Sequence, residues 1–149
     1  MKRDFTKLEK QIHYVFKDKN LLITALTHKT YAFEAEEPIE YNERLEFLGD
    51  SILNFVVAEK LYQTNQHFSE GELTRRRALQ VNNSLLAKKA KILKLGKYLL
   101  LGKGESLQDG YKNPKNIANA LEALIGAIYI DSNIDTVRSF ILEILLKSD

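Results

Sequence analysis

The chain has no cysteine and no tryptophan among its 149 residues, and it has only two prolines. The absence of cysteine excludes disulfides, thiolate catalysis and cysteine-ligated zinc, and it is typical of a protein from a reducing compartment. The three histidines, His13, His28 and His67, lie too far apart in the sequence to form a local metal-binding motif. Any metal ion would therefore be bound through oxygen atoms.

Long apolar runs are also missing. No run approaches the roughly 20 residues that a membrane span needs, and the N-terminal segment M-K-R-D-F-T-K-L-E lacks the apolar core of a signal peptide. With 44% apolar residues, the chain is large enough to bury a core as one domain. We therefore expect a single soluble domain over residues 1–149, with no membrane partner and a cytoplasmic location.

Charged residues are abundant but segregated. Between Tyr31 and Asp50 there are seven acidic residues and one basic residue, whereas between Glu70 and Lys115 there are eleven basic and four acidic residues. Such a distribution allows one region to bind a cation and another to bind a polyanion. Each run could equally be a solvated helix face, so charge alone leaves both interpretations open.

Apolar periodicity and capping residues predict an all-α fold, and no alternating strand pattern or internal repeat stands out. The first helix is expected to begin at Asp4 or Thr6, and a short second one at Asn20. Longer helices are expected at 42–62, 69–81, 82–93, 115–129 and 134–146. The segment 29–41, which contains Pro38, and the glycine-rich segment 96–114 are predicted to be loops.

The stretch N-E-R-L-E-F-L-G-D-S-I-L-N at 42–54 carries three carboxylates on one side of its predicted helix. Glu43, Glu46 and Asp50 fall within an arc of about 60°. The core stripe is expected on the opposite side and comprises Leu45, Leu48, Ile52, Phe55 and Val56. Three anions in a partly buried site either take up protons or recruit a cation. Oxygen ligands favour Mg²⁺ or Mn²⁺ over zinc.

The helix expected at 115–129 offers a second half of this site. Its apolar stripe comprises Leu121, Leu124, Ile125 and Ile128. Asn119 and Glu122 lie away from that stripe, beside Ala123 and Gly126, whose small size lets another backbone approach closely. We expect this face to pack on the 42–62 helix and to bring Asn119 and Glu122 to the three carboxylates. From periodicity alone, both polar residues could instead be exposed helix positions.

These residues carry a family resemblance. The run N-E-R-L-E-F-L-G-D-S at 42–51 resembles the signature of ribonuclease III, and the resemblance continues in A-L-T-H-K-T at 25–30, E-G-E-L at 70–73 and N-A-L-E-A-L-I-G-A-I-Y at 119–129. It covers nearly the whole chain, all of it similar to the nuclease domain. The double-stranded-RNA-binding domain usual in this family does not follow Asp149, so either it was removed or the natural protein does without it.

The resemblance implies an all-helical endonuclease domain that acts as a homodimer on double-stranded RNA and leaves staggered ends with short 3′ overhangs. It implies metal ligands at Glu46, Asp50 and Glu122, for Mg²⁺ with Mn²⁺ as a substitute. Glu43 and Glu70 would be further acids of the catalytic valley, and Phe47 would insert into a socket on the partner subunit. The candidate RNA-binding residues, nominated for their charge, are Arg75, Arg76, Arg77, Lys103, Lys112 and Lys115.

One residue departs from the family pattern. Asn119 stands where the second motif normally has an aspartate, so this metal-ligand position keeps a carbonyl oxygen but lacks the negative charge, and metal affinity should fall. Three explanations remain open: a substitution made to trap an uncleaved complex, a natural variant that still works, or a degenerate nuclease that only binds. The alternative function is therefore a non-cleaving domain that binds structured RNA or a protein partner.

Overall fold

The computed structural model describes residues 3–147, and these residues form helices, turns and one isolated parallel bridge between Thr27 and Leu100. In chain order the α-helices are α1 (Thr6–Ile12), α2 (Lys19–Leu26), α3 (Lys29–Glu34), α4 (Glu43–Thr64), α5 (Glu70–Val81), α6 (Asn83–Ile92), α7 (Lys103–Leu107), α8 (Pro114–Asp131) and α9 (Ile134–Phe140). The 3-10 turns η1 (Leu95–Tyr98) and η2 (Gly110–Lys112) flank α7, and the π-helical turn η3 (Ile141–Leu145) follows α9. The all-α prediction is confirmed.

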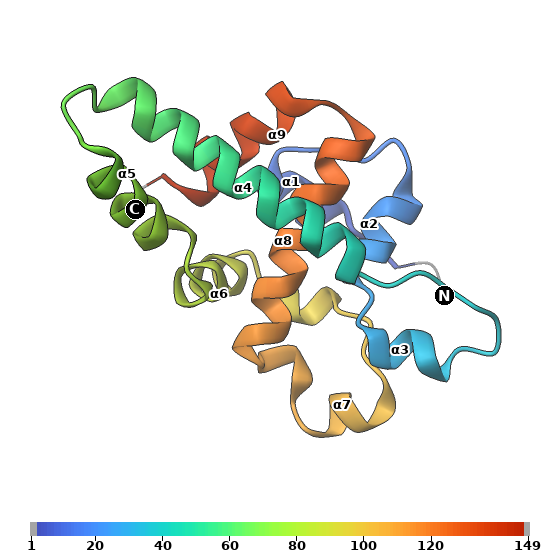
Figure 1. Ribbon diagram of the computed structural model, residues 1–149. Helices are drawn as coiled ribbons and strands as arrows, with labels where there is room; N and C mark the ends of the chain where they lie inside the picture. Colours follow the sequence, from blue (N-terminus) through green and yellow to red (C-terminus); the bar gives the residue numbers. More distant parts are fainter. Residues whose placement is uncertain (1–2, 148–149) are drawn as a thin grey trace.

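Helix α8 is the centre of the fold. Its start is fixed by Asn113, whose side chain accepts hydrogen bonds from the backbone N–H groups of Lys115 and Asn116, and by Pro114 in the first turn. From Asn116 to Ile128 every residue except Asn119 is buried. Helices α2, α4 and α6 pack around it, with α4 crossing over it in Figure 1. A helix surrounded in this way must be apolar on nearly all sides, as this one is.

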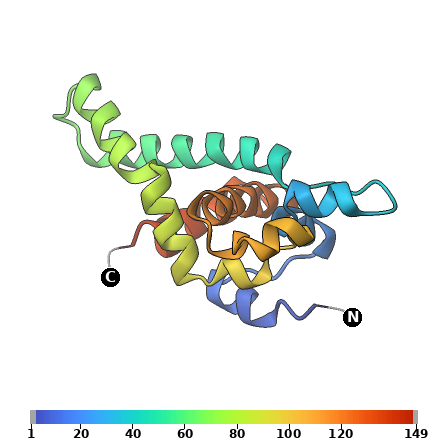
Figure 2. The same cartoon turned by 90° about the horizontal axis from the view of Figure 1, so that it is seen from below.

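Helix α4 lies along one side of the molecule. In Figure 2 it covers α8, and no described helix covers its outer side. Its buried residues are Leu45, Gly49, Ile52, Leu53, Val56, Val57 and Leu61. The sequence prediction placed Phe55 in the core stripe, but Phe55 is exposed, because the buried side is rotated toward Leu53 and Val57. The buried stripe therefore borders the carboxylates instead of lying opposite to them.

The predicted helix boundaries hold best where a side chain caps the first turn. Ser69 accepts a hydrogen bond from the N–H of Glu72 at the start of α5, and Asn82 accepts one from Leu85 at the start of α6. Helix α2 begins earlier than expected, since Asp18 and not Asn20 is its cap. Helix α5 has no buried residue and projects to one side of the body (Figure 1).

The two predicted loops contain short helices. The segment 29–41 begins with α3, which is capped by the ring nitrogen of His28 and buries only Ala32. The segment 96–114 contains α7, held against α3 by the Glu34 carboxylate, which accepts a hydrogen bond from the N–H of Lys103. Helices of five or six residues bury too few side chains to leave an apolar period in the sequence. Within residues 3–147, none of the helices combines the length and the apolar character that a membrane crossing requires.

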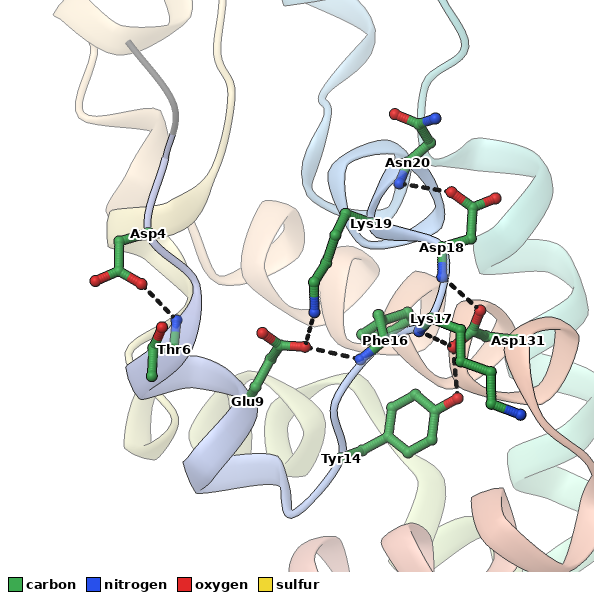
Figure 3. A network of polar contacts seen from close by, with 10 residues as sticks. All are labelled: Asp4, Thr6, Glu9, Tyr14, Phe16, Lys17, Asp18, Lys19, Asn20 and Asp131. Atoms are coloured by element: carbon green, nitrogen blue, oxygen red, sulfur yellow. Dashed lines mark hydrogen bonds and ion pairs between the residues drawn. The ribbon is translucent and has the colours of Figure 1, made fainter.

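Two carboxylates, one within the N-terminal segment and one on α8, fix the position of this segment (Figure 3). Glu9 on α1 accepts hydrogen bonds from the backbone N–H of Phe16, at 2.7 Å, and from the ammonium of Lys19, at 2.6 Å. Asp131, at the end of α8, accepts one from the hydroxyl of Tyr14 and others from the N–H groups of Lys17 and Asp18. These contacts join the α1–α2 connection to the central helix.

Candidate active site

Two glycines allow α4 and α8 to cross in backbone contact. A Cβ atom on Gly49 would lie 1.7 Å from the carbonyl oxygen of Glu122, and one on Gly126 would lie 2.4 Å from the carbonyl oxygen of Leu45. Neither position can therefore accept a side chain unless the helices move apart. The predicted packing of the α8 face that carries Gly126 onto α4 is confirmed, and this crossing brings Glu122 to the carboxylates of α4.

Glu122 is the buried centre of the acidic group. Its exposed fraction is only 5%, and its carboxyl group shares a hydrogen bond with Asp50. Burial, this hydrogen bond and the negative charges of Asp50 and Glu46 raise the pKa of Glu122 to about 8. The side chain therefore holds a proton near neutral pH when no cation is present.

Glu46 lies on α4, one turn before Asp50, and is half-buried. Burial raises the pKa of Glu46, and the charges of Glu43 and Asp50 raise it further, whereas the ammonium of Lys115 opposes the shift. Lys115 thus supplies positive charge beside the acidic group from the first turn of α8. We call Glu46, Asp50 and Glu122 the carboxylate cluster.

The other predicted site residues are placed at different distances from this cluster. Glu43 is exposed at the first residue of α4, close enough to act on Glu46. Asn119 is half-buried on α8, one turn before Glu122 and within about 60° of it around the helix. Glu70 begins α5 beyond the far end of α4 and accepts a hydrogen bond from Thr74. Glu70 therefore does not join the cluster of its own chain.

Oxygen is the only donor element of the carboxylate cluster. Among residues 3–147 no three His, Asp or Glu side chains are already arranged closely enough to hold a metal ion. The cluster nevertheless fits a divalent cation in its chemistry, because three acids and the Asn119 amide oxygen are hard ligands. Burial first, and then the acids beside it, raise the pKa of Glu122, so a cation near this group would offset both effects. Binding a cation would require Glu122 to lose its proton and the side chains to converge.

The predicted RNA-binding residues are dispersed. Arg75 and Arg76 both pair with Glu72, at 2.7 and 2.8 Å, and these contacts lower the pKa of Glu72 to about 2. Arg77 lies further along α5 and is half-buried, and Lys103 is exposed at the start of α7. Lys115 is the candidate that acts on the carboxylate cluster, and Lys112 lines a separate hollow together with four lysines that were not predicted as RNA-binding residues.

Phe47 projects from the outer side of α4, with 79% of its surface exposed. Beside it is an apolar hollow of about 870 Å³, whose walls include Leu21, Ile39, Tyr41, Leu48 and Ile130. Tyr62, further along the same side of α4, is also exposed. Phe47 is thus not a core residue. The hollow was not predicted, because its walls come from four separate segments.

The sequence that forms this site matches a known family over most of the chain. The family profile described as "Ribonuclease-III-like" matches residues 18–148. The chain belongs to the ribonuclease III family. The resemblance found in the signature at 42–51 is therefore confirmed.

Sequence identity and structural similarity to individual members of the ribonuclease III family support this assignment. Ribonuclease 3 of Caldanaerobacter subterraneus subsp. tengcongensis is 44% identical over 93% of this chain and 61% of that protein. Ribonuclease 3 of Clostridium tetani is 47% identical over 94% of this chain and 59% of that protein. A solved structure of the nuclease domain of ribonuclease III from Campylobacter jejuni has a TM-score of 0.89 and 40% identity, and the match covers 95% of this chain and 96% of that one.

The two curated relatives are longer than this chain. The chain spans about three fifths of their length, whereas it matches nearly all of the Campylobacter jejuni nuclease domain. Its fold is that of a ribonuclease III nuclease domain. The expectation of an all-α endonuclease-type helical bundle is confirmed.

Proposed function

We propose that this ribonuclease III-type domain is a metal-dependent endoribonuclease that cleaves double-stranded RNA and leaves staggered ends with short 3′ overhangs. The observation that carries the proposal is the carboxylate cluster, in which a buried glutamate is held against two acids by the crossing of α4 and α8. A cluster that only stabilised the fold would be expected to pair the buried group with a cation or with donors, whereas Glu122 lies against two acids and the Lys115 ammonium acts on Glu46. RNA processing in the cytoplasm follows as a prediction from this activity.

Glu46, Asp50 and Glu122, with the carbonyl oxygen of Asn119, would hold Mg²⁺, for which Mn²⁺ could substitute. When bound, the metal ion supplies a water nucleophile at neutral pH and stabilises charge on the phosphate. The protein residues place their oxygen atoms on two helices that cross in close contact. Lys115 would contact the phosphate beside Glu46, and the exposed acid Glu43 would lie at the edge of the site.

Double-stranded RNA would be bound mainly through its phosphates and recognised by its A-form shape. Lys103, Lys112, Lys115 and the α5 arginines are the candidates for these contacts. Because phosphate contacts dominate, we expect this chain to bind duplex RNA weakly and with a strong dependence on salt.

The domain is proposed to form a homodimer through the outer side of α4. Phe47 is exposed next to an apolar hollow, and a two-fold axis would place each Phe47 against the hollow of the other chain. The Campylobacter jejuni structure is described as having flexibility in a region involved in dimer formation, which supports dimer formation by this domain. Glu70 could then serve as an acid of the valley between two chains.

Phe47→Asp should yield a folded monomer, measured by sedimentation.

The proposed activity is tested by incubating the chain and its Asn119→Asp variant with a long, perfect RNA duplex at low salt, in Mg²⁺ and in Mn²⁺. We expect the variant to cut faster and to leave staggered ends, because the aspartate restores a negative ligand. Glu122→Gln in the same background is the matched control and should be silent. If neither the chain nor the Asn119→Asp variant cuts with either metal ion, the catalytic proposal fails.

The second candidate function is a non-cleaving domain that binds structured RNA or a protein partner. Asn119 is the observation that favours it, since the metal-ligand set has one charge fewer than the family pattern. This candidate requires that duplex RNA or a partner binds without divalent metal and that Asn119→Asp gains no cleavage.

A further inference from the structure

Five exposed lysines surround a hollow of about 860 Å³ between α6, η1, η2 and the first turn of α8. They are Lys88, Lys91, Lys94, Lys97 and Lys112, and the first four follow one another at intervals of three residues. We call this the lysine-lined hollow. No acidic residue is among the described residues that line it, and within residues 3–147 none of the five lysines forms an ion pair. A concave surface with charge of one sign concentrates ligands of the opposite sign.

The lysine-lined hollow has an apolar part, which we call its floor. It comprises Ala87, Pro114 and Ile117, next to Tyr111. A Cβ atom on Gly96 would lie 2.1 Å from the carbonyl oxygen of Tyr111, so η1 and η2 are in backbone contact and the hollow is preformed. Its volume is in the range of small-molecule sites, roughly 300–1,000 Å³.

Two side chains suggest what the hollow binds. The ring of Tyr111 is partly exposed, with the ammonium of Lys112 at 5.4 Å from its centre, so an aromatic face and positive charge stand together. Lys94 also lines the hollow, although its backbone is left-handed with φ 55°, a conformation that favours glycine. A ligand that suits both would have an aromatic ring and several negative charges.

The hollow is separate from the carboxylate cluster. Ile117 precedes Glu122 by five residues and is therefore about 140° away around α8. Duplex RNA presents a convex backbone and keeps its bases paired inside, so it cannot place a base against Tyr111. We propose that the lysine-lined hollow binds a nucleoside polyphosphate, with its phosphates on the lysines and its base against Tyr111 and the apolar floor.

The test is titration calorimetry with ATP at low salt in EDTA, where the carboxylate cluster has no metal ion to hold phosphates. Lys91→Ala/Lys94→Ala should weaken ATP binding at least about tenfold, because two charge-assisted contacts are lost. The matched control Lys7→Ala/Lys10→Ala removes two exposed lysines with the same spacing from α1 and should change affinity by less than about twofold. Tyr111→Ala should weaken binding about fivefold or more, whereas Tyr111→Phe should not.

Lys94→Gly separates binding from folding. It relieves the left-handed backbone, so its melting temperature should stay equal or rise while ATP affinity falls. The proposal is overturned if ATP does not bind, or if the α1 control weakens it as much as the double variant. It is also overturned if tripolyphosphate binds as tightly as ATP, since the hollow would then be a general anion-binding patch. Binding of single-stranded RNA more than about tenfold more tightly than ATP would likewise overturn it, since the hollow would then be an RNA-binding groove.

Discussion

Among residues 3–147 two glutamates are buried, and their surroundings are opposite. Glu9 has an exposed fraction of 8% and accepts hydrogen bonds from Phe16 N–H and Lys19. Glu122 has an exposed fraction of 5% and lies against Asp50 and Glu46, with burial and these acids raising its pKa to about 8. A buried carboxylate with donors and a cation stabilises the fold, whereas one placed among other acids is typical of a functional site.

The surroundings of the two glutamates differ because their side chains belong to different kinds of packing. Glu9 belongs to a local structure, since Phe16 and Lys19 follow within ten residues and the chain folds back on itself. Glu122 is brought to α4 by a crossing of two helices that are distant in sequence. The first arrangement needs only a turn, and the second needs Gly49 and Gly126 at matching positions.

Glu122→Gln has the largest expected effect, because it tests whether the activity requires the buried acid of the carboxylate cluster. Cleavage should fall by about a thousandfold or more, because the amide keeps the shape but removes a negative metal ligand. The measurement is the single-turnover rate on duplex RNA, made in the parent chain or in the Asn119→Asp background, whichever cuts faster. The variant should be at least as stable as its parent at pH 8 without metal, since a buried acid no longer has to be ionised. Near-normal cleavage would count against the proposed role.

The helix crossing is the next target. Gly49→Ala should reduce the free energy of unfolding by about 3 kcal/mol or more, because the new methyl group would meet the carbonyl oxygen of Glu122 and force α4 from α8. Urea unfolding measures this loss. Gly104→Ala is the control, since nothing lies within 4 Å of its Cβ position, and it should not destabilise the protein. Equal stability of the two variants would contradict the close contact.

Glu9→Gln tests the other buried glutamate, which is paired with a cation. Losing the charge that pairs with Lys19 should destabilise the fold by about 1–3 kcal/mol, because the amide replaces a charge-assisted hydrogen bond with a weaker one and the lysine remains partly exposed. The cleavage rate per folded molecule should stay within about twofold of the parent, since Glu9 lies outside the carboxylate cluster. A large loss of cleavage at unchanged stability would show that the two glutamates are not functionally distinct.

Sequence patterns predicted the elements that have long apolar periods and side-chain caps. Ser69 and Asn82 begin helices as expected, and the small residues Ala123 and Gly126 correctly indicated the face that meets α4. They did not predict α3, whose short length leaves no period, nor the exposure of Phe55, which depends on how far α4 is rotated against α8. Periodicity defines a stripe along one helix, but neighbouring helices decide which part of that stripe is covered.

The same limit applies to the site. Periodicity placed Glu43, Glu46 and Asp50 on one side of α4 and Glu122 on the face of α8 that meets α4. The resemblance to ribonuclease III then grouped Glu46, Asp50 and Glu122 as predicted metal ligands. It also grouped Glu70 with them, although this residue begins α5 beyond the far end of α4. The lysine-lined hollow left a signal in the three-residue spacing of its lysines, but its apolar floor comes from segments that only the fold brings together.

The protonation of Glu122 gives the smallest and most specific effect. Its pKa is raised from 4.5 to about 8 on folding, so between these values the folded state binds more protons than the unfolded state, and metal-free stability should decrease as pH rises through this window.

A cation must displace that proton, so binding of Mn²⁺ at pH 7 should release close to one proton. Calorimetry in two buffers with different ionisation enthalpies counts the protons released. Glu122→Gln should release none from this position, and the parent should release none well above the raised pKa. Metal binding at pH 7 without proton release would mean that Glu122 is already ionised before the metal binds. Glu122 and Glu9 would then both be ionised and would differ only in the residues around them.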